Sequence, residues 1–220
     1  MPQYDDDVRM DSNRRLFIAR HGETVFNAAS RLQGDHPHTP LTRAGFAQAD
    51  AMGSALRATL GARPAITLWA SPTGRALQTL AVIAEHLELD WHAARTDARL
   101  GEIAMSGWSG RYYREVIADH GPILDAKTGL FAMRPPGGEW YDDIAARLRA
   151  WLDDTESEGG DRLIVSHGIT SRVLRGILTG MADAPEANAP IAPGLPQGSV
   201  VMIAGGSESV VALGTGRAPA

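Results

Sequence analysis

Short apolar runs alternate with longer segments of mixed polarity along the chain, and this alternation predicts strands separated by helices. Residues 16–20 and 162–166 are rich in bulky apolar side chains and too short for helices, and each run is followed by histidine and glycine. Such runs are typical of strands that are buried on both faces of a parallel sheet. Further strands are expected at 65–70, within 91–100, at 199–204 and at 209–213.

Amphipathic segments between these runs predict helices that cover the sheet. Thr42 is a suitable N-cap for a helix over 43–60, because its side chain can accept a hydrogen bond from the first turn. Ser71 followed by Pro72 predicts the start of the next helix, with serine as the cap and proline at its favoured first position. The first of these helices would follow a turn-rich loop over 27–40, and the second would follow its strand directly.

The second half of the chain repeats the arrangement. A helix is expected over 139–152, with Arg147 and Arg149 among the charged residues on its solvated face. Another helix is expected over 169–178, directly after the strand at 162–166. Alternating strands and helices predict a three-layer α/β/α fold with a mostly parallel central sheet.

The length of the chain bounds the number of domains. A chain of 220 residues suits one α/β domain with a full core and is short for two. We expect this domain over 14–214, after an acidic, disordered leader at 1–13. Segment 103–137 is expected to form a lid over the sheet edge, 184–198 a loop insertion, and 214–220 a frayed tail.

Composition excludes several classes of function. The net charge of -5 and the lack of a basic run argue against a nucleic-acid partner. The sequence contains no cysteine, which excludes disulfides, thiolate catalysis and cysteine-bound zinc. No signal peptide or membrane-spanning stretch is evident, so a cytoplasmic protein is expected. Nothing in the composition indicates an oligomeric state.

Polar residues follow two of the predicted strands at the point where each strand ends. Arg20 and His21 end the first strand, and His167 follows the strand at 162–166. In open α/β sheets, ligands bind outside the carboxyl ends of the strands. Two histidines delivered to the same edge could therefore face each other across a small pocket.

Arg75 and Glu102 are further candidates for chemistry. Arg75 falls in the opening turn of a predicted helix, where the guanidinium and the backbone N–H groups could both bind an anion. Glu102 is flanked by apolar residues and glycines. From the sequence alone, a capping or surface role for Glu102 is as compatible as a catalytic one.

These residues belong to a series of motifs that resembles the histidine phosphatase superfamily, also called the phosphoglycerate mutase-like family. The series spans nearly the whole chain, and its order and spacing make it far more specific than a single Arg-His-Gly. Its parts are Arg20-His21-Gly22-Glu23-Thr24 with Asn27, Arg31-Leu32-Gln33-Gly34, Pro40-Leu41-Thr42 with Gly45, Ser71-Pro72-Thr73-Gly74-Arg75, Glu102, Pro136-Gly137-Gly138-Glu139 and Val165-Ser166-His167-Gly168.

The residue types agree with what the resemblance implies, a phosphomonoesterase that needs no metal ion or cofactor. His21 would attack phosphorus through an unprotonated nitrogen and form a phosphohistidine, while its other nitrogen donates to an acceptor. Arg20, Arg75 and a protonated His167 would surround the phosphoryl oxygens. Glu102 would protonate the leaving oxygen and later activate water.

The resemblance also implies binding residues around the phosphate. Asn27 and Gln33 would line the pocket and hold the phosphate or its leaving group, although their side chains could equally bond their own loop. Gly168 would contribute to phosphate binding beside His167. The substrate would be a small phosphate ester whose identity the sequence does not indicate.

Two departures from the family pattern affect the rim of this pocket. Many members carry glycine and serine where this chain has Ile169 and Trp140. One alternative function is a cofactor-dependent phosphoglycerate mutase, although 103–137 is less basic than the segment expected in such mutases. A second alternative is a non-catalytic module that binds a phosphorylated ligand on the same fold.

Overall fold

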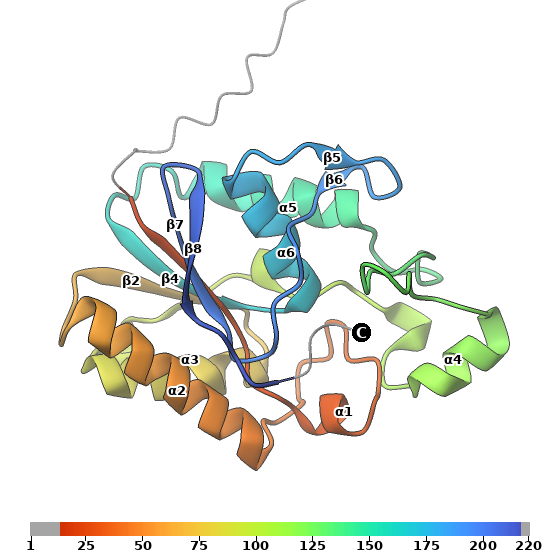
Figure 1. Ribbon diagram of the computed structural model, residues 1–220, viewed down its shortest axis with the longest axis horizontal. Coiled ribbons are helices and arrows are strands. Elements are labelled where there is room, and N and C mark those ends of the chain that lie inside the picture. The colour runs from red at the N-terminus through yellow and green to blue at the C-terminus, as the bar shows by residue number, and fades with distance from the viewer. Residues whose placement is uncertain (1–13, 217–220) are drawn as a thin grey trace, which may run out of the picture.

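A computed structural model of the protein describes residues 14–216 and contains a six-stranded central sheet in the order β3-β2-β4-β1-β7-β8 (Figure 1). Strands β1, β4, β2 and β3 run parallel, whereas β7 and β8 are antiparallel to their neighbours. The fold class predicted from the sequence is confirmed. The strands are β1 Leu16–Arg20, β2 Ile66–Ala70, β3 Arg95–Thr96, β4 Asp161–Ser166, β7 Val200–Ala204 and β8 Ser207–Ala212.

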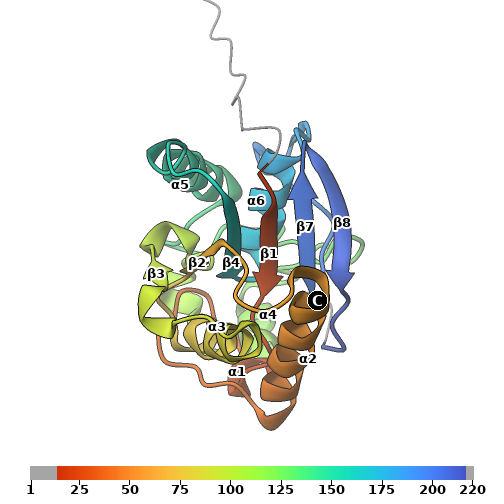
Figure 2. The same ribbon diagram turned by 90° about the vertical axis from the view of Figure 1, so that its left-hand side faces the viewer.

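Helices cover both faces of the sheet. Figure 2 shows α2 and α3 together on one side and α5 and α6 on the other. Alternate residues of β1 face the two layers, because Phe17 belongs to the core cluster under α2 and α3 while Ile18 belongs to the cluster under α5 and α6. The helices are α2 Arg43–Leu60, α3 Gly74–Leu87, α5 Tyr141–Asp154 and α6 Gly168–Leu178.

Shorter elements lie at the edge of the sheet where β1 ends. Helices α1 and α4 lie beyond the carboxyl end of β1 (Figure 1). The remaining elements are α1 Val25–Ala28, η1 Trp91–Ala93, η2 Ala98–Leu100, η3 Ser106–Trp108, α4 Tyr113–His120, β5 Asp183–Ala184 and β6 Ala189–Pro190. No helix within 14–216 is long and apolar enough to cross a membrane.

The start of α3 differs from the prediction. Thr73 is its N-cap and Gly74 its first residue, so Ser71 and Pro72 lie outside the helix. The cause is the neighbouring strand, because the N–H of Ser71 donates to the carbonyl of Val165 at 3.1 Å and continues the pairing of β2 with β4. The Ser71 hydroxyl is buried near Thr73 instead of capping the helix.

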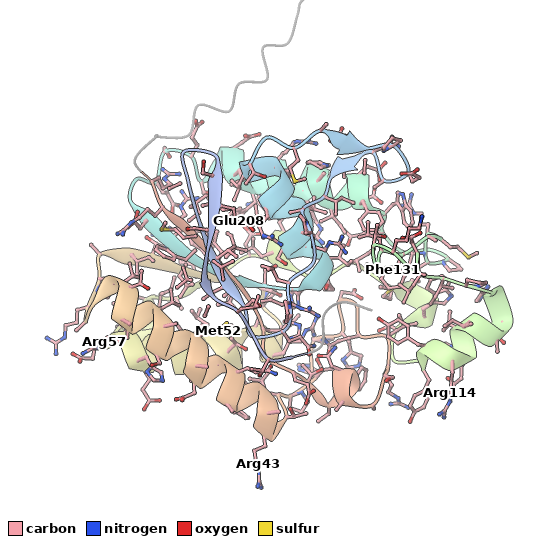
Figure 3. The ribbon with its side chains drawn as sticks, viewed as in Figure 1. Arg43, Met52, Arg57, Arg114, Phe131 and Glu208 are labelled. Carbon is pink, nitrogen blue, oxygen red and sulfur yellow. The ribbon has the colours of Figure 1, made fainter. Side chains whose placement is uncertain are left out.

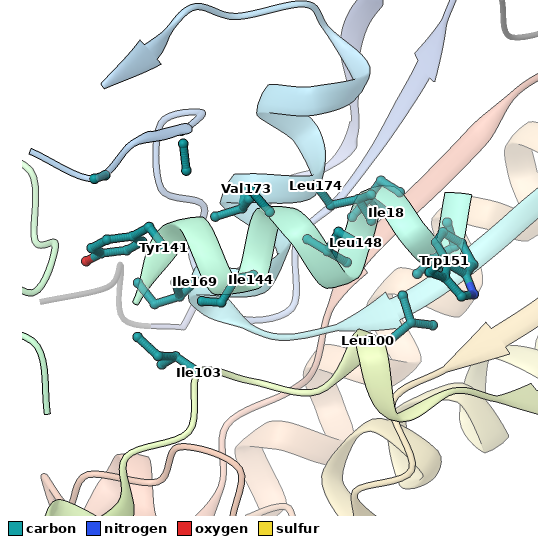
Figure 4. Packing of buried hydrophobic residues seen from close by; sticks show 14 of the residues in the cluster. Ile18, Leu100, Ile103, Tyr141, Ile144, Leu148, Trp151, Ile169, Val173 and Leu174 are labelled. Carbon is teal, nitrogen blue, oxygen red and sulfur yellow. The ribbon is translucent and has the colours of Figure 1, made fainter. Parts of the chain in front are cut away.

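Helix α5 packs its apolar stripe against the sheet as expected, but one of its charged residues is wrongly predicted. Ile144, Leu148 and Trp151 point toward the core residues of the sheet and of α6 (Figure 4). Arg147 does not face solvent, because its side chain pairs with Glu139 and donates to backbone carbonyls of the preceding loop. Arg147 is largely buried because Glu139 and the carbonyl of Gly101 satisfy its charge and its N–H groups.

The two ends of the chain were predicted to be disordered or frayed. Residues 1–13 and 217–220 lie outside the described residues. The described part of the predicted tail, 214–216, is packed against the protein. There is no room for a side chain at Gly214, since a Cβ there would lie 2.0 Å from the carbonyl oxygen of Gln197. The N–H of Gly216 donates to the same carbonyl. For these three residues the prediction of a frayed tail is wrong.

Candidate active site

The parallel pairing of β1 with β4 brings the two predicted strand ends together. Arg20 is in register with Ser166, and the N–H of His21 donates to the Ser166 carbonyl at 3.1 Å. His21 and His167 are both buried, with ring centroids 5.2 Å apart and ring planes at 64°. The sheet therefore places two imidazoles edge to face at one point.

The hydrogen bonds of His21 select one tautomer. Its Nδ1 lies 2.7 Å from the carbonyl oxygen of Gly22, which can only accept, so Nδ1 carries the proton and Nε2 keeps its lone pair. Burial lowers the pKa of His21 well below its usual value, and the charges of Arg75 and Arg20 lower it further. The ring is therefore neutral, with Nε2 available as a nucleophile.

His167 is held in the opposite tautomer. Arg75 donates from Nε to Nδ1 of His167 at 3.2 Å, so Nδ1 accepts and the ring proton is on Nε2. Burial lowers the pKa of His167 well below its usual value, with further lowering by Arg75 and then by His21. The expectation of a protonated His167 is wrong for this arrangement, because an imidazolium cannot accept from a guanidinium.

Arg75 is fully buried, and its guanidinium mainly holds protein groups. It donates to the carbonyl oxygens of Gly34 and His36, each at 2.7 Å, to the hydroxyl of Thr39 at 3.0 Å, and to His167. Burial lowers its pKa to about 10. Four of its five N–H groups are used, which leaves a single donor rather than the bidentate pair expected for phosphate.

Arg20 keeps more of its hydrogen-bonding capacity. Its Nη1 donates to the carbonyl of Leu195 at 2.6 Å, but its Nε is buried without a hydrogen-bond partner among the described residues. Burial lowers the pKa of Arg20 to about 10, although the nearby charge of Glu102 raises it. Arg20 also approaches Gly168 closely, where a Cβ would lie 3.4 Å from its Nη2.

Glu102 lies at the N-terminus of α6. Its carboxyl oxygens accept from the backbone N–H groups of Ile169 and Thr170, both at 3.1 Å, and from the Thr170 hydroxyl at 3.2 Å. The orphan N–H groups and the dipole of a helix N-terminus stabilise negative charge. These contacts connect the loop after η2 to the strand-end histidine, because α6 begins immediately after His167.

Asn27 and Gln33 are both tied to Thr24. The Asn27 oxygen accepts from the Thr24 backbone N–H at 3.1 Å, so the free end of this amide is its NH₂ group. The Gln33 oxygen lies 2.6 Å from the Thr24 hydroxyl. Each side chain therefore bonds within the chain, as one of the two alternatives expected, and each also lines a cavity at this edge of the sheet.

A cavity of about 380 Å³ opens at this edge of the sheet. Six of the predicted residues form part of its wall: Arg20, His21, Asn27, Gln33, Glu102 and Gly168. Arg75 and His167, which have no exposed surface, lie behind this wall. The structure thus brings all eight predicted residues together but places two of them out of direct reach of the cavity.

The family model described as histidine phosphatase superfamily, branch 1, matches residues 16–212. The chain belongs to this superfamily. The match covers the whole sheet and every element that contributes to the cavity. The resemblance inferred from the motifs is therefore confirmed.

Relatives of this chain are named for several activities. A glucosyl-3-phosphoglycerate phosphatase of Mycobacterium tuberculosis is 31% identical over 87% of this chain and 86% of its own. A Yersinia enterocolitica protein named as a probable phosphoglycerate mutase is 33% identical over 78% of both chains. A 6-phosphofructo-2-kinase/fructose-2,6-bisphosphatase of Caenorhabditis elegans is 31% identical over 80% of this chain, which spans only 36% of that protein.

Solved structures agree with this placement. The mycobacterial glucosyl-3-phosphoglycerate phosphatase, in a complex with VO3, superposes with a TM-score of 0.68 at 28% identity and covers 93% of this chain and 100% of that one. The similarity therefore extends over almost the entire fold.

Sequence reasoning missed several residues of the cavity. Arg31, Tyr113 and Gln197 all line it, and none was singled out for chemistry. Burial raises the pKa of Tyr113 to about 12, with a further contribution from the charge of Glu102. Arg31 stood within a quoted motif, but Tyr113 and Gln197 carried no signal, because only the fold brings their segments to the strand ends.

Within residues 14–216 no group of three His, Cys, Asp or Glu side chains is arranged to hold a metal ion. The positive charge at the cavity comes from arginine side chains of the protein itself.

Proposed function

We propose that this histidine phosphatase hydrolyses a small phosphate monoester through a phosphohistidine formed at Nε2 of His21. The observation that carries the proposal is the His21–Gly22 hydrogen bond, which leaves Nε2 unprotonated on the wall of the cavity. The unpaired Nε of Arg20 on the same wall supplies a donor for a phosphoryl oxygen. A cavity of about 380 Å³ is of the size that takes a small molecule.

In the first step, Nε2 of His21 bonds to phosphorus and the bond from phosphorus to the ester oxygen breaks. The leaving oxygen takes a proton from the carboxyl group of Glu102. The carboxylate that remains is stabilised by the N–H groups of Ile169 and Thr170 at the start of α6. Proton transfer of this kind contributes roughly 10²–10⁴ in rate.

In the second step, water attacks phosphorus and the bond from phosphorus to Nε2 breaks. The carboxylate of Glu102 accepts the proton of the attacking water, which returns both residues to their starting states. Arg20 and the NH₂ group of Asn27 hold the phosphoryl oxygens through both steps, while Arg75 and His167 support this wall of the cavity from behind. Loss of one such donor costs roughly 10²–10³ in turnover.

The same proposal includes independence of metal ions and cofactors. Arginine donors and neutral histidines supply the charge stabilisation and the nucleophile, so each step is complete with groups of this chain. Addition of a chelator is therefore expected to leave the rate unchanged, whereas vanadate is expected to inhibit by occupying the place of the transferred phosphoryl group.

Transfer to a second hydroxyl, as in a mutase, is the alternative reaction. Such transfer requires the enzyme to retain the intermediate substrate through further charged contacts. In the segment 103–137, Arg111 pairs with Asp119 and Arg134 pairs with Asp143, so two of its cations are already neutralised. This pairing favours hydrolysis over retention.

A single experiment tests the proposal and both alternatives. The purified protein is mixed with a phosphate monoester, with and without chelator, and is followed by phosphate release and by intact mass after a quench without acid. We expect release under both conditions and a transient phosphoryl adduct that His21→Ala lacks. An adduct that persists in His21→Ala would contradict the assignment, isomerised ester without phosphate release would indicate a mutase, and binding without either product would indicate a binding module.

A further inference from the structure

The cavity has a second end, formed by Arg31 and the segment that was predicted as a lid. Arg31 lies in the loop after α1 and forms an isolated bridge with Tyr112, directly before α4. This end is built by Arg31 and by residues of 103–137, whereas Arg20, His21 and Gly168 reach the same cavity from the strand ends. A phosphate monoester bound at His21 would extend its leaving group toward it.

Arg31 carries unused hydrogen-bonding capacity at this end. Its guanidinium carbon lies 4.4 Å from the centroid of the Tyr112 ring and 5.5 Å from that of Phe26. Its Nε is buried without a hydrogen-bond partner among residues 14–216. A shielded donor without a partner is costly and calls for an acceptor from outside the chain.

Six apolar side chains also line the cavity, those of Ile103, Met105, Ile117, Leu124, Phe131 and Ile169. Figure 3 shows Phe131 on the inner side of the segment, whereas Arg114 projects from α4 away from the body of the protein. An apolar or aromatic group bound against these side chains would lose water-exposed surface.

We propose that the preferred substrate has an apolar leaving group that ends in a carboxylate, with Arg31 as the residue that binds this carboxylate. The inference rests on the proposed function, because it places the reacting phosphate at His21. A carboxylate fits the planar fork of one guanidinium, and its single charge matches that of Arg31. The carboxylate takes no part in the bond changes.

The test compares two esters of the same shape, 3-carboxyphenyl phosphate and 3-carbamoylphenyl phosphate. The ratio of their kcat/KM values is measured for the wild type, Arg31→Met, Arg31→Lys and Arg114→Met. Arg114 is a matched control, because it also stacks on Tyr112, at 4.6 Å, but does not line the cavity. Because the ratio compares two esters on the same variant, a general loss of activity or stability cancels from it.

We expect the wild type to prefer the carboxylate by roughly tenfold or more, as for loss of one charge-assisted hydrogen bond. Arg31→Met should bring the ratio close to one, Arg31→Lys should keep part of the preference, and Arg114→Met should not change it. A ratio that Arg31→Met leaves unchanged, or that Arg114→Met lowers equally, would overturn the proposal.

Binding separates failure of this inference from failure of the proposed function. The dissociation constants of both esters are measured with His21→Ala, alone and combined with Arg31→Met. If binding prefers the carboxylate ester and depends on Arg31, but the wild type hydrolyses neither ester, the proposed binding site is supported and the proposed hydrolase is refuted. Hydrolysis of both esters by the wild type, with no preference in rate or binding, would keep the hydrolase and refute the site.

Discussion

Replacing Arg147 by methionine is expected to destabilise the protein, whereas the same change at Arg149 is not. Arg147 bonds both carboxyl oxygens of Glu139, at 2.9 and 3.3 Å, and donates to the carbonyl of Gly101 at 2.9 Å. Glu139 in turn accepts from the N–H of Ala104 at 2.9 Å. This ion pair therefore fixes the loop that carries Glu102 on both of its sides.

The magnitude follows from the burial of the pair. The Arg147 and Glu139 side chains are only 16% and 24% exposed. Removing one partner of a fully buried pair costs about 3–5 kcal/mol, so partial exposure reduces the expected loss to about 2–4 kcal/mol. Arg149 lies 4.0 Å from Asp183 with both side chains about half exposed. Its removal should cost less than about 1 kcal/mol.

Urea denaturation of the wild type, Arg147→Met and Arg149→Met measures these differences. Arg147→Met should also reduce kcat more than it raises KM, because the loop with Glu102 loses its support while the phosphate-binding residues keep theirs. Equal stability of the two variants would refute the reasoning. A destabilised Arg147→Met with unchanged kcat would also refute it, since the Arg147–Glu139 pair would then not determine the position of Glu102.

Two further predictions concern pH and packing. Folding lowers the pKa values of His21 and His167. Just below pH 6.5 the unfolded chain therefore binds more protons than the folded protein. The free energy of unfolding should then fall on acidification by up to about 1.4 kcal/mol per pH unit for each histidine. Denaturation at pH 7 and 5 would show no such fall if the rings were already charged. Gly45→Ala places a Cβ 2.1 Å from the Glu23 carbonyl oxygen and should cost about 1–3 kcal/mol, whereas Gly107→Ala meets nothing within 4 Å and should be nearly neutral, as thermal melts can compare.

The sequence predicted the features that depend on local pattern. Apolar runs identify strands, and parallel strands end at one edge, so the meeting of His21 with His167 could be expected. The partners of Arg75 could not, because they lie in the loop from Gly34 to Thr39, far from it in the sequence. The pattern of charges likewise predicted Arg147 on the solvated face of its helix. This was wrong because the folded chain brings Glu139 beside it.

The position of β1 at the centre of the sheet has a consequence for the order of folding. Leu16 pairs with Arg162 on one side and with Ile203 on the other, so both neighbours of β1 come from the last third of the chain. Contacts between such distant segments close large loops, and proteins rich in them fold slowly. During synthesis, an apolar strand with two unpaired edges must wait until its neighbours have emerged. The strand that carries Arg20 is therefore also the segment most exposed to misassembly before the sheet closes around it.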